Sequence, residues 1–238
     1  MARILLISNS TVHGRGYLDH VEEEIEDFLG RVRTVLFFPF ALYDHDDYAA
    51  KAKARFVAMG YSLESAHATD NLQKAIDRAE AIFIGGGNTF RLLKALQDLE
   101  LLEPIRGKVK HGAPYIGSSA GSNVAGPTLK TTKDMPIVQP RSFNSLGLVP
   151  FQISPHYLDP DPTSTHMGET QEERILQFLE ENETPVAGLR EGAWLLIENG
   201  AVTLKGETGA RIFRRGHAPI EVTTGAEISK LVGGPDAS

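Results

Sequence analysis

The sequence predicts an α/β fold in which helices cover both faces of a mostly parallel central sheet. Along the first half of the chain, short apolar runs alternate with longer stretches whose apolar residues recur at helical spacing. Continuous apolar runs are typical of strands that are buried on both faces. The helical stretches between them suit the crossovers that parallel strands require, so we expect a layered sheet with helices on both sides.

Each expected element of the first half has its own pattern. The first helix is indicated by Leu18, Val21, Ile25 and Phe28, which recur at helical spacing. The apolar runs expected to form strands are RILLIS at 3–8, TVLFFPF at 34–40, YSLESA at 61–66, EAIFIGGG at 80–87 and APYIG at 113–117. Helices are expected over 16–30, 46–60, 71–79 and 88–102.

After residue 130 the pattern changes towards antiparallel structure. Strands are expected at 148–155 and 185–189 with a helix over 168–182 between them, and 193–206 resembles a hairpin that turns at Asn199-Gly200. Segments 210–216 and 218–225 are expected as short antiparallel strands at the edge of the same sheet. We therefore expect one domain over 1–238, in which 233–238 form a flexible tail.

The composition excludes several classes of function. The chain has 238 residues, a formal net charge of −7 and no cysteine, so disulfides, thiolate metal sites and a cysteine nucleophile are excluded. No long run of Lys or Arg suggests nucleic-acid binding. The apolar run near the N-terminus is too short for a signal peptide core or a membrane span. We expect a cytoplasmic protein without nucleic-acid or membrane partners, and a homodimer stays open.

The segment YIGSSAGSN contains a candidate nucleophile. Residues 117–121 read GSSAG, a G-x-S-x-G pattern placed between an expected strand and a helix. The glycines permit a tight turn that exposes the central Ser119, whereas Ser118 falls in a variable position. The backbone N–H of Ala120 and the helix dipole would favour negative charge there. The pattern alone is also compatible with an ordinary helix cap.

A serine nucleophile needs a base and an orienting acid, and the chain offers candidates for both. Of the eight histidines, His156 lies just past an apolar run, where its strand should end on the same edge as Ser119. Asp134 and Glu191 are the two candidate acids. Each of these side chains could also be an ordinary loop residue.

A second glycine cluster, IGGGNTF at 84–90, also ends a strand and opens a helix. Its backbone N–H groups could approach a substrate closely, and Asn88 can cap the helix and offer an amide. An oxyanion site, a phosphate cradle and a plain turn are all consistent with it. A nucleotide site is poorly supported because neither G-x-G-x-x-G nor G-K-[ST] is present.

Taken together, seven ordered blocks resemble the peptidase E family, which is serine peptidase family S51. They extend over nearly the whole chain, to about residue 200, and the blocks are LLISNST (5–11), FFPFA (37–41), GGGNTFRLLK (85–94), YIGSSAGSNVAGPTLKTTKDMPIVQP (115–140), QISPHY (152–157), GETQEERI (168–175) and GLREGAWL (188–195). The resemblance implies a three-layer α/β sandwich of the class I glutamine-amidotransferase type. It also implies a serine peptidase that cleaves dipeptides with an N-terminal aspartate, without metal or cofactor.

The resemblance also implies roles for individual residues. Ser119 corresponds to the nucleophile and His156 to the base. Asp134 is favoured as the third member, with Glu191 as the alternative. Gly87 and Ala120 would supply oxyanion-hole N–H groups, and Asn88 would help to hold the substrate.

One departure from the family pattern concerns the substrate. Gln171 stands in GETQ, where the family commonly has an arginine that would suit a substrate carboxylate. Lys133, Arg141, Arg174 or Arg190 could substitute, or the pocket could accept other N-terminal residues. Three alternatives therefore stay open: a cyanophycinase-like enzyme, a broader serine aminopeptidase, and a non-catalytic protein that binds a small molecule.

Overall fold

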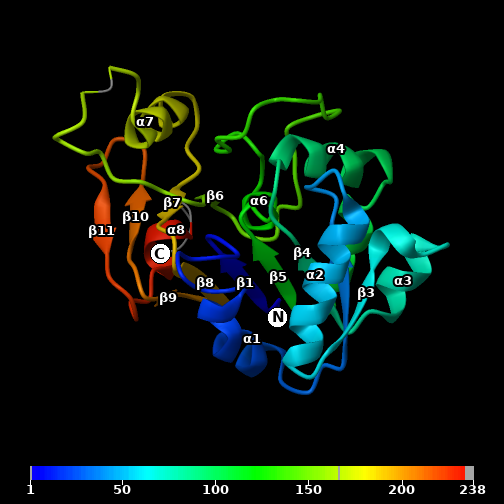
Figure 1. Ribbon diagram of the computed structural model, residues 1–238. Helices are drawn as coiled ribbons and strands as arrows, with labels where there is room; N and C mark the ends of the chain where they lie inside the picture. The colour runs from blue at the N-terminus through cyan, green and yellow to red at the C-terminus, as the bar shows by residue number, and fades with distance from the viewer. Residues whose placement is uncertain (1, 166, 234–238) are drawn as a thin grey trace.

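The computed structural model describes residues 2–165 and 167–233, and residues 234–238 of the expected tail lie outside this range. Figure 1 shows the elements in order. The strands are β1 (Ile4–Ile7), β2 (Thr34–Phe38), β3 (Ser62–Ser65), β4 (Ala81–Ile84), β5 (Tyr115–Ser118), β6 (Gln152–Ser154), β7 (Val186–Leu189), β8 (Ala193–Glu198), β9 (Ala201–Gly206), β10 (Ala210–Phe213) and β11 (Ile220–Val222). The helices are η1 (Asp19–Val21), α1 (Glu22–Leu29), α2 (His45–Ala58), η2 (Ala66–Ala68), α3 (Leu72–Arg78), α4 (Thr89–Asp98), α5 (Leu102–Lys110), α6 (Ala120–Asn123), α7 (Gln171–Glu181) and α8 (Ser229–Val232).

The central sheet has seven strands in the order β3-β2-β4-β5-β1-β8-β9. The first five of these are parallel to their neighbours, whereas β8 and β9 add an antiparallel hairpin at one edge. Alternate residues of each strand face opposite sides. On β1, Leu5 and Ile7 pack with buried residues of α1 and α2, and Ile4 and Leu6 pack with buried residues of α3, α4 and α5. The predicted parallel sheet with helices on both faces is confirmed.

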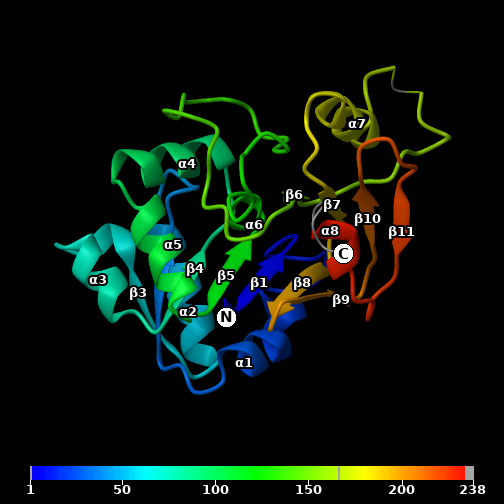
Figure 2. The ribbon, with the colours of Figure 1, turned by 180° about the vertical axis from the view of Figure 1, so that it is seen from behind.

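The expectation of one extended sheet is wrong for the C-terminal part. β6, β7, β10 and β11 form a second, four-stranded sheet in the order β11-β10-β7-β6. Figure 2 shows this second sheet beside β8 and β9, with α7 close to it. Strand periodicity reports which residues are buried but not which strand is the neighbour, so the sequence could not separate the two sheets.

Two further differences concern helices. The expected helix 88–102 ends early, because the chain breaks at Leu99–Leu101 and a separate helix, α5, follows. Pro104 lies in the first turn of α5, where a missing N–H costs nothing. Pro104 and Gly107 suggest a loop in the sequence, so this helix was not predicted.

The architecture brings several strand ends to one edge. The parallel strands β1, β4 and β5 end there at Ile7, Ile84 and Ser118. β6 and β7 of the second sheet end beside them, since the backbone N–H of His156 reaches the side chain of Ser8. Loops that follow these strands therefore meet where the two sheets approach each other.

Candidate active site

The turn between β5 and α6 presents Ser119 in a strained conformation. Ser119 has φ 52° and ψ −109°, which is unusual for a residue with a side chain. A Cβ atom at Gly121 would lie 2.1 Å from the carbonyl oxygen of Ile84, and one at Gly117 would lie 2.6 Å from the carbonyl oxygen of Gly121. The two glycines are thus required by the close contact between strand and helix. This is the local geometry of a nucleophile elbow.

Ser119, His156 and Glu191 form a continuous hydrogen-bonded chain. The Oγ of Ser119 lies 2.9 Å from Nε2 of His156. Nδ1 of the same ring lies 2.7 Å from Oε1 of Glu191. A hydroxyl, an imidazole and a carboxylate in this order can deprotonate the serine and stabilise the imidazolium that results.

The structure places Glu191, and not the favoured Asp134, beside His156. Oδ2 of Asp134 accepts hydrogen bonds from the backbone N–H and from the hydroxyl of Thr89, both at 2.6 Å. Asp134 therefore stabilises the N-terminus of α4, where a carboxylate is favourable. Both ring nitrogens of His156 are engaged by Ser119 and Glu191, so the position beside the imidazole belongs to the alternative, Glu191.

The two backbone amides expected to hold an oxyanion are free. Within residues 2–165 and 167–233, neither Gly87 N nor Ala120 N has a hydrogen-bond acceptor. Gly87 has φ +133°, and a Cβ atom there would lie 2.6 Å from the carbonyl oxygen of Ala41. The neighbouring amide, Gly86 N, donates to the hydroxyl of Tyr48 at 2.8 Å and is therefore occupied.

Tyr48 is a site residue that the sequence analysis missed. It comes from α2, and its buried ring lies against the glycine loop, since a Cβ atom at Gly85 would lie 2.4 Å from its hydroxyl oxygen. Burial raises the pKa of the Tyr48 hydroxyl, so it stays neutral and accepts the Gly86 N–H. A tyrosine within an amphipathic helix carries no sequence signal of such a contact.

The expected substrate residues Asn88 and Gln171 hold loops together. Oδ1 of Asn88 caps α4 by accepting from the N–H of Arg91, while its Nδ2 donates to the carbonyl of Met135. Oε1 of Gln171 accepts from the N–H of Leu158 at 3.0 Å. A substrate contact of either side chain stays a prediction.

One pocket contains the serine, and a second, smaller pocket lies on the other side of Lys133. A cleft of about 530 Å³ contains Ser119 and His156, together with Gly87, Asp134 and Lys51. A small pocket of about 70 Å³ is lined by Gln171, Lys133 and Arg174, with no carboxylate among its lining residues.

Lys133 links the two pockets. Its Nζ donates to the backbone carbonyl of His156 at 2.6 Å. Burial of the ammonium lowers the pKa of Lys133 to about 8, although Asp134 and Glu191 act in the opposite direction. The small pocket is therefore positive at neutral pH.

Among the described residues, no group of three or more His, Asp or Glu side chains could hold a metal ion. Nor does any described helix combine the length and apolarity needed to cross a membrane.

Comparisons with known proteins show the family of the chain. The model of peptidase family S51 matches residues 4–205. A protein named Peptidase E from Streptomyces coelicolor is 52% identical over 229 residues, which cover 96% of this chain and 94% of the relative. A Drosophila melanogaster protein named "Probable alpha-aspartyl dipeptidase" is 44% identical over 232 residues, covering 96% of this chain and 97% of the relative.

A solved structure shares the fold. The crystal structure of a peptidase from an acI-B1 actinobacterium superposes with a TM-score of 0.73 at 16% identity, covering 95% of this chain and 96% of that one. The α/β sandwich is thus the class I glutamine-amidotransferase-like fold that the resemblance implied. Since the family model spans most of the chain and both sequence relatives match nearly end to end, the chain belongs to peptidase family S51.

Proposed function

We propose that the chain is a serine dipeptidase that hydrolyses dipeptides with an N-terminal aspartate through an acyl-enzyme. The observation that carries this proposal is the hydrogen-bonded chain Ser119–His156–Glu191 beside two free backbone amides. The name of the Drosophila melanogaster relative supports the α-aspartyl specificity. Neither step of the reaction needs a metal ion or an organic cofactor.

The proposed reaction follows from the geometry. Ser119 attacks the scissile carbonyl carbon while Nε2 of His156 takes the hydroxyl proton, and Glu191 stabilises the imidazolium. The tetrahedral oxyanion lies against the N–H groups of Gly87 and Ala120. His156 then gives its proton to the leaving amine as the C–N bond breaks. In the second half, His156 takes a proton from water, the hydroxide attacks the ester carbonyl, and the Ser119 oxygen leaves with the proton.

Recognition of the aspartyl side chain needs a positive group, and Gln171 is neutral. Lys133 and Arg174 flank Gln171 in the small pocket next to His156. We propose that these two cations bind the side-chain carboxylate of the substrate, with the Gln171 amide as a neutral donor beside them. The free α-ammonium of the substrate needs an acceptor, and Asp47 and Asp134 line the cleft. Asp159 is not available for this role because it pairs with Arg190.

The test is a panel of Asp-Leu, Ala-Leu and isoaspartyl-Leu assayed with the wild type and Ser119→Ala. We expect turnover of Asp-Leu above the other two, and a loss of several orders of magnitude in Ser119→Ala. A fluorophosphonate probe should label the wild type at Ser119 and leave the variant unlabelled. Hydrolysis that persists in Ser119→Ala would refute the assignment of the nucleophile.

A second candidate function is a broader serine aminopeptidase or a cyanophycinase-like enzyme, and the neutral Gln171 favours it. Comparable turnover of Ala-Leu and Asp-Leu would support a broad aminopeptidase. Preference for the isoaspartyl substrate would support the cyanophycinase-like alternative. Folded protein that neither turns over a dipeptide nor reacts with the probe would instead indicate a non-catalytic binding protein.

The location of the protein and its oligomeric state are also proposals. We propose a cytoplasmic enzyme whose partner is a small peptide, and sedimentation at assay concentration decides between a monomer and a homodimer.

A further inference from the structure

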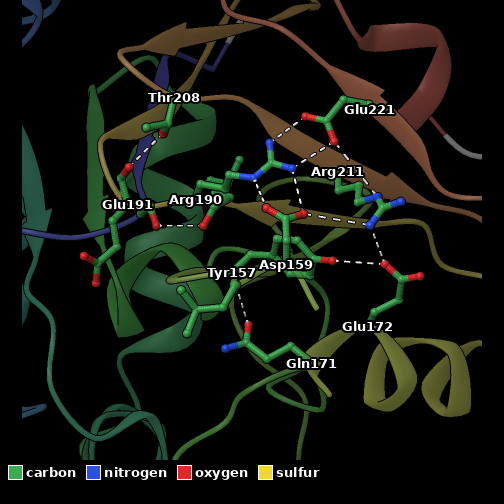
Figure 3. Close-up of polar contacts among 12 residues, drawn as sticks. Tyr157, Asp159, Gln171, Glu172, Arg190, Glu191, Thr208, Arg211 and Glu221 are labelled. Carbon is green, nitrogen blue, oxygen red and sulfur yellow. Dashed lines mark hydrogen bonds and ion pairs between the residues drawn. The ribbon is translucent and has the colours of Figure 1, made fainter. Parts of the chain in front are cut away.

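A cluster of charged side chains adjoins the chain segments that carry His156 and Glu191. It consists of Asp159, Glu172, Arg190, Arg211 and Glu221, and Figure 3 shows Asp159 and Glu221 at Arg190, and Glu172 and Asp159 at Arg211. None of these residues belongs to the reaction described above. The cluster nevertheless joins the two segments that carry the base and its acid.

We propose that the ion pair Asp159–Arg190 is a clamp that positions His156 against Glu191. Both members are positioning residues, since neither lies in the hydrogen-bonded chain. The inference rests on the proposed function, because it concerns the efficiency of that reaction.

The clamp joins the segment that follows His156 to the segment that precedes Glu191. Arg190 immediately precedes Glu191 at the end of β7, and Asp159 lies in the loop that follows His156 at the end of β6. A contact between Asp159 and Arg190 therefore fixes the loop of the base relative to the loop of the acid. The backbone bond from Tyr157 N to Leu189 O, 2.8 Å long, joins the same two segments.

The guanidinium of Arg190 makes paired hydrogen bonds with two carboxylates. Nε and Nη2 of Arg190 donate to the two oxygens of Asp159 at 2.6 and 2.8 Å. Nη1 and Nη2 donate to the two oxygens of Glu221 at 2.6 and 2.8 Å. Paired donors fix orientation as well as distance, which a single point contact does not. The two carboxylates also engage the guanidinium fully, so Arg190 does not compete with His156 for Glu191.

The His156–Glu191 contact needs neighbouring contacts to hold its two side chains in place. His156 has φ 54°, a conformation that costs free energy for a residue with a side chain. The side chains of His156 and Glu191 are 37% and 53% exposed, so their attraction is partly screened by water. A weak contact to a strained residue depends on the backbone on either side, and a displacement of about 1 Å can cost about 100-fold in rate.

The matched experiment uses the two carboxylates that share Arg190. Asp159→Asn weakens the contact with the His156 loop, whereas Glu221→Gln weakens an equivalent contact with β11, which carries no catalytic residue. For Asp159→Asn we expect kcat on Asp-Leu to fall about tenfold with KM within about twofold of the wild type, a loss in line with a small displacement of the base. For Glu221→Gln we expect kcat and KM within about twofold of the wild type, because the Asp159–Arg190 contact still joins the two loops when the contact of Glu221 is weakened.

A spectroscopic measurement separates positioning from a general loss of stability. In the NMR spectrum of the folded protein without substrate, the Nδ1–H proton of His156 should give a low-field signal through its bond to Glu191. We expect this signal to broaden or move upfield in Asp159→Asn and to stay in place in Glu221→Gln. Thermal unfolding of both variants shows how much each substitution lowers stability. Both side chains are exposed, so both variants should stay folded at the assay temperature.

Two results would overturn the clamp. One is an Asp159→Asn enzyme with wild-type kcat and an unchanged low-field signal. The other is a Glu221→Gln enzyme that loses activity and signal to the same extent, because a merely structural cluster would treat both carboxylates alike. If the wild type fails to hydrolyse Asp-Leu, the proposed function fails, while the NMR comparison still decides whether Asp159 positions His156.

Discussion

Ser119 and His156 both adopt positive φ angles, of 52° and 54°. Such conformations are costly for residues other than glycine, and they persist only where surrounding contacts impose them. Here the N–H of Ser119 donates to Ile7 O at 3.0 Å, and the N–H of His156 donates to Oγ of Ser8 at 2.9 Å. The end of β1 thus fixes the positions of Ser119 and His156 relative to each other.

The roles of the two acidic residues can be separated by paired substitutions. Glu191→Gln should lower kcat by about 1,000-fold, because the neutral amide no longer stabilises the imidazolium or selects the tautomer of His156. Asp134→Asn should lower kcat less than about tenfold, and it should reduce the free energy of unfolding by about 1 kcal/mol by weakening the N-terminus of α4. Steady-state kinetics and urea unfolding of both variants measure this. The reverse order of kcat losses would reinstate Asp134 as the acid.

The lowered pKa of Lys133 predicts a pH dependence of substrate binding. Burial lowers the pKa of its ammonium to about 8, so the side chain is positive below this pH and loses its charge above it. The KM of Asp-Leu should therefore rise more than that of Ala-Leu as the pH passes through about 8, because the α-amino group that both substrates share also loses its proton in this range. Lys133→Arg keeps its charge, so the difference between the two substrates should appear only at higher pH. A KM for Asp-Leu that stays constant up to pH 10 would contradict a role of Lys133 in binding the carboxylate.

At the scale of elements, the turn from β5 to α6 depends on two glycines. A Cβ atom at Gly121 would meet the backbone of β4 at the carbonyl of Ile84, which cannot move without displacing the strand. Any residue with a Cβ atom at position 121 would prevent α6 from lying this close to the sheet. The G-x-S-x-G pattern predicts this turn, and the structure supplies its cause.

Gly121→Ala should be severely destabilising. We expect a loss of about 3 kcal/mol in the free energy of unfolding, at the upper end for overpacking, because the obstructing atoms are backbone. Urea unfolding measures this, with Gly107→Ala on α5 as the control, since nothing lies within 4 Å of the Cβ position at Gly107. Equal stability of the two variants would show that the strand yields easily.

At the scale of the whole molecule, the site lies where the two sheets meet. Ser8 follows β1 in the large sheet and is completely buried. Its Oγ donates to Leu189 O of β7 and accepts from His156 N beyond β6, both at 2.9 Å. One hydroxyl thus connects the large sheet to the two strands of the second sheet that precede His156 and Glu191.

Ser8→Ala should therefore affect stability and activity together. It leaves a buried N–H at His156 and a buried carbonyl at Leu189 with one partner fewer, which costs about 1–3 kcal/mol. We expect kcat to fall as well, since the strained backbone of His156 loses its anchor. Ser122→Ala is a useful control, because its buried hydroxyl bonds only to backbone carbonyls within the large sheet. A Ser8→Ala enzyme with wild-type kcat would show that other contacts suffice.

The sequence by itself determined the parallel sheet and the tight turn at Ser119, and it singled out His156 as the candidate base. These follow from local rules, since burial on both faces produces continuous apolar strands and a tight strand-to-helix turn needs glycines around Ser119. The position of His156 just past an apolar run placed it near Ser119, although β6 lies in the second sheet and not in the sheet of Ser119, because the ends of the two sheets meet at Ser8. The residues alone offered Asp134 and Glu191 as candidate acids, and the family resemblance favoured Asp134.

Only the tertiary structure decided which acid contacts His156, which strands form the second sheet, and how Tyr48 and Arg190 take part. Asp134 and Glu191 both lie in loops that can reach the site, and their spacing in the sequence is equally compatible with either role. The choice depends on which strand pairs with β6. Because β7 is its parallel neighbour, Glu191 is brought beside His156, while Asp134 is held by Thr89 at the start of α4.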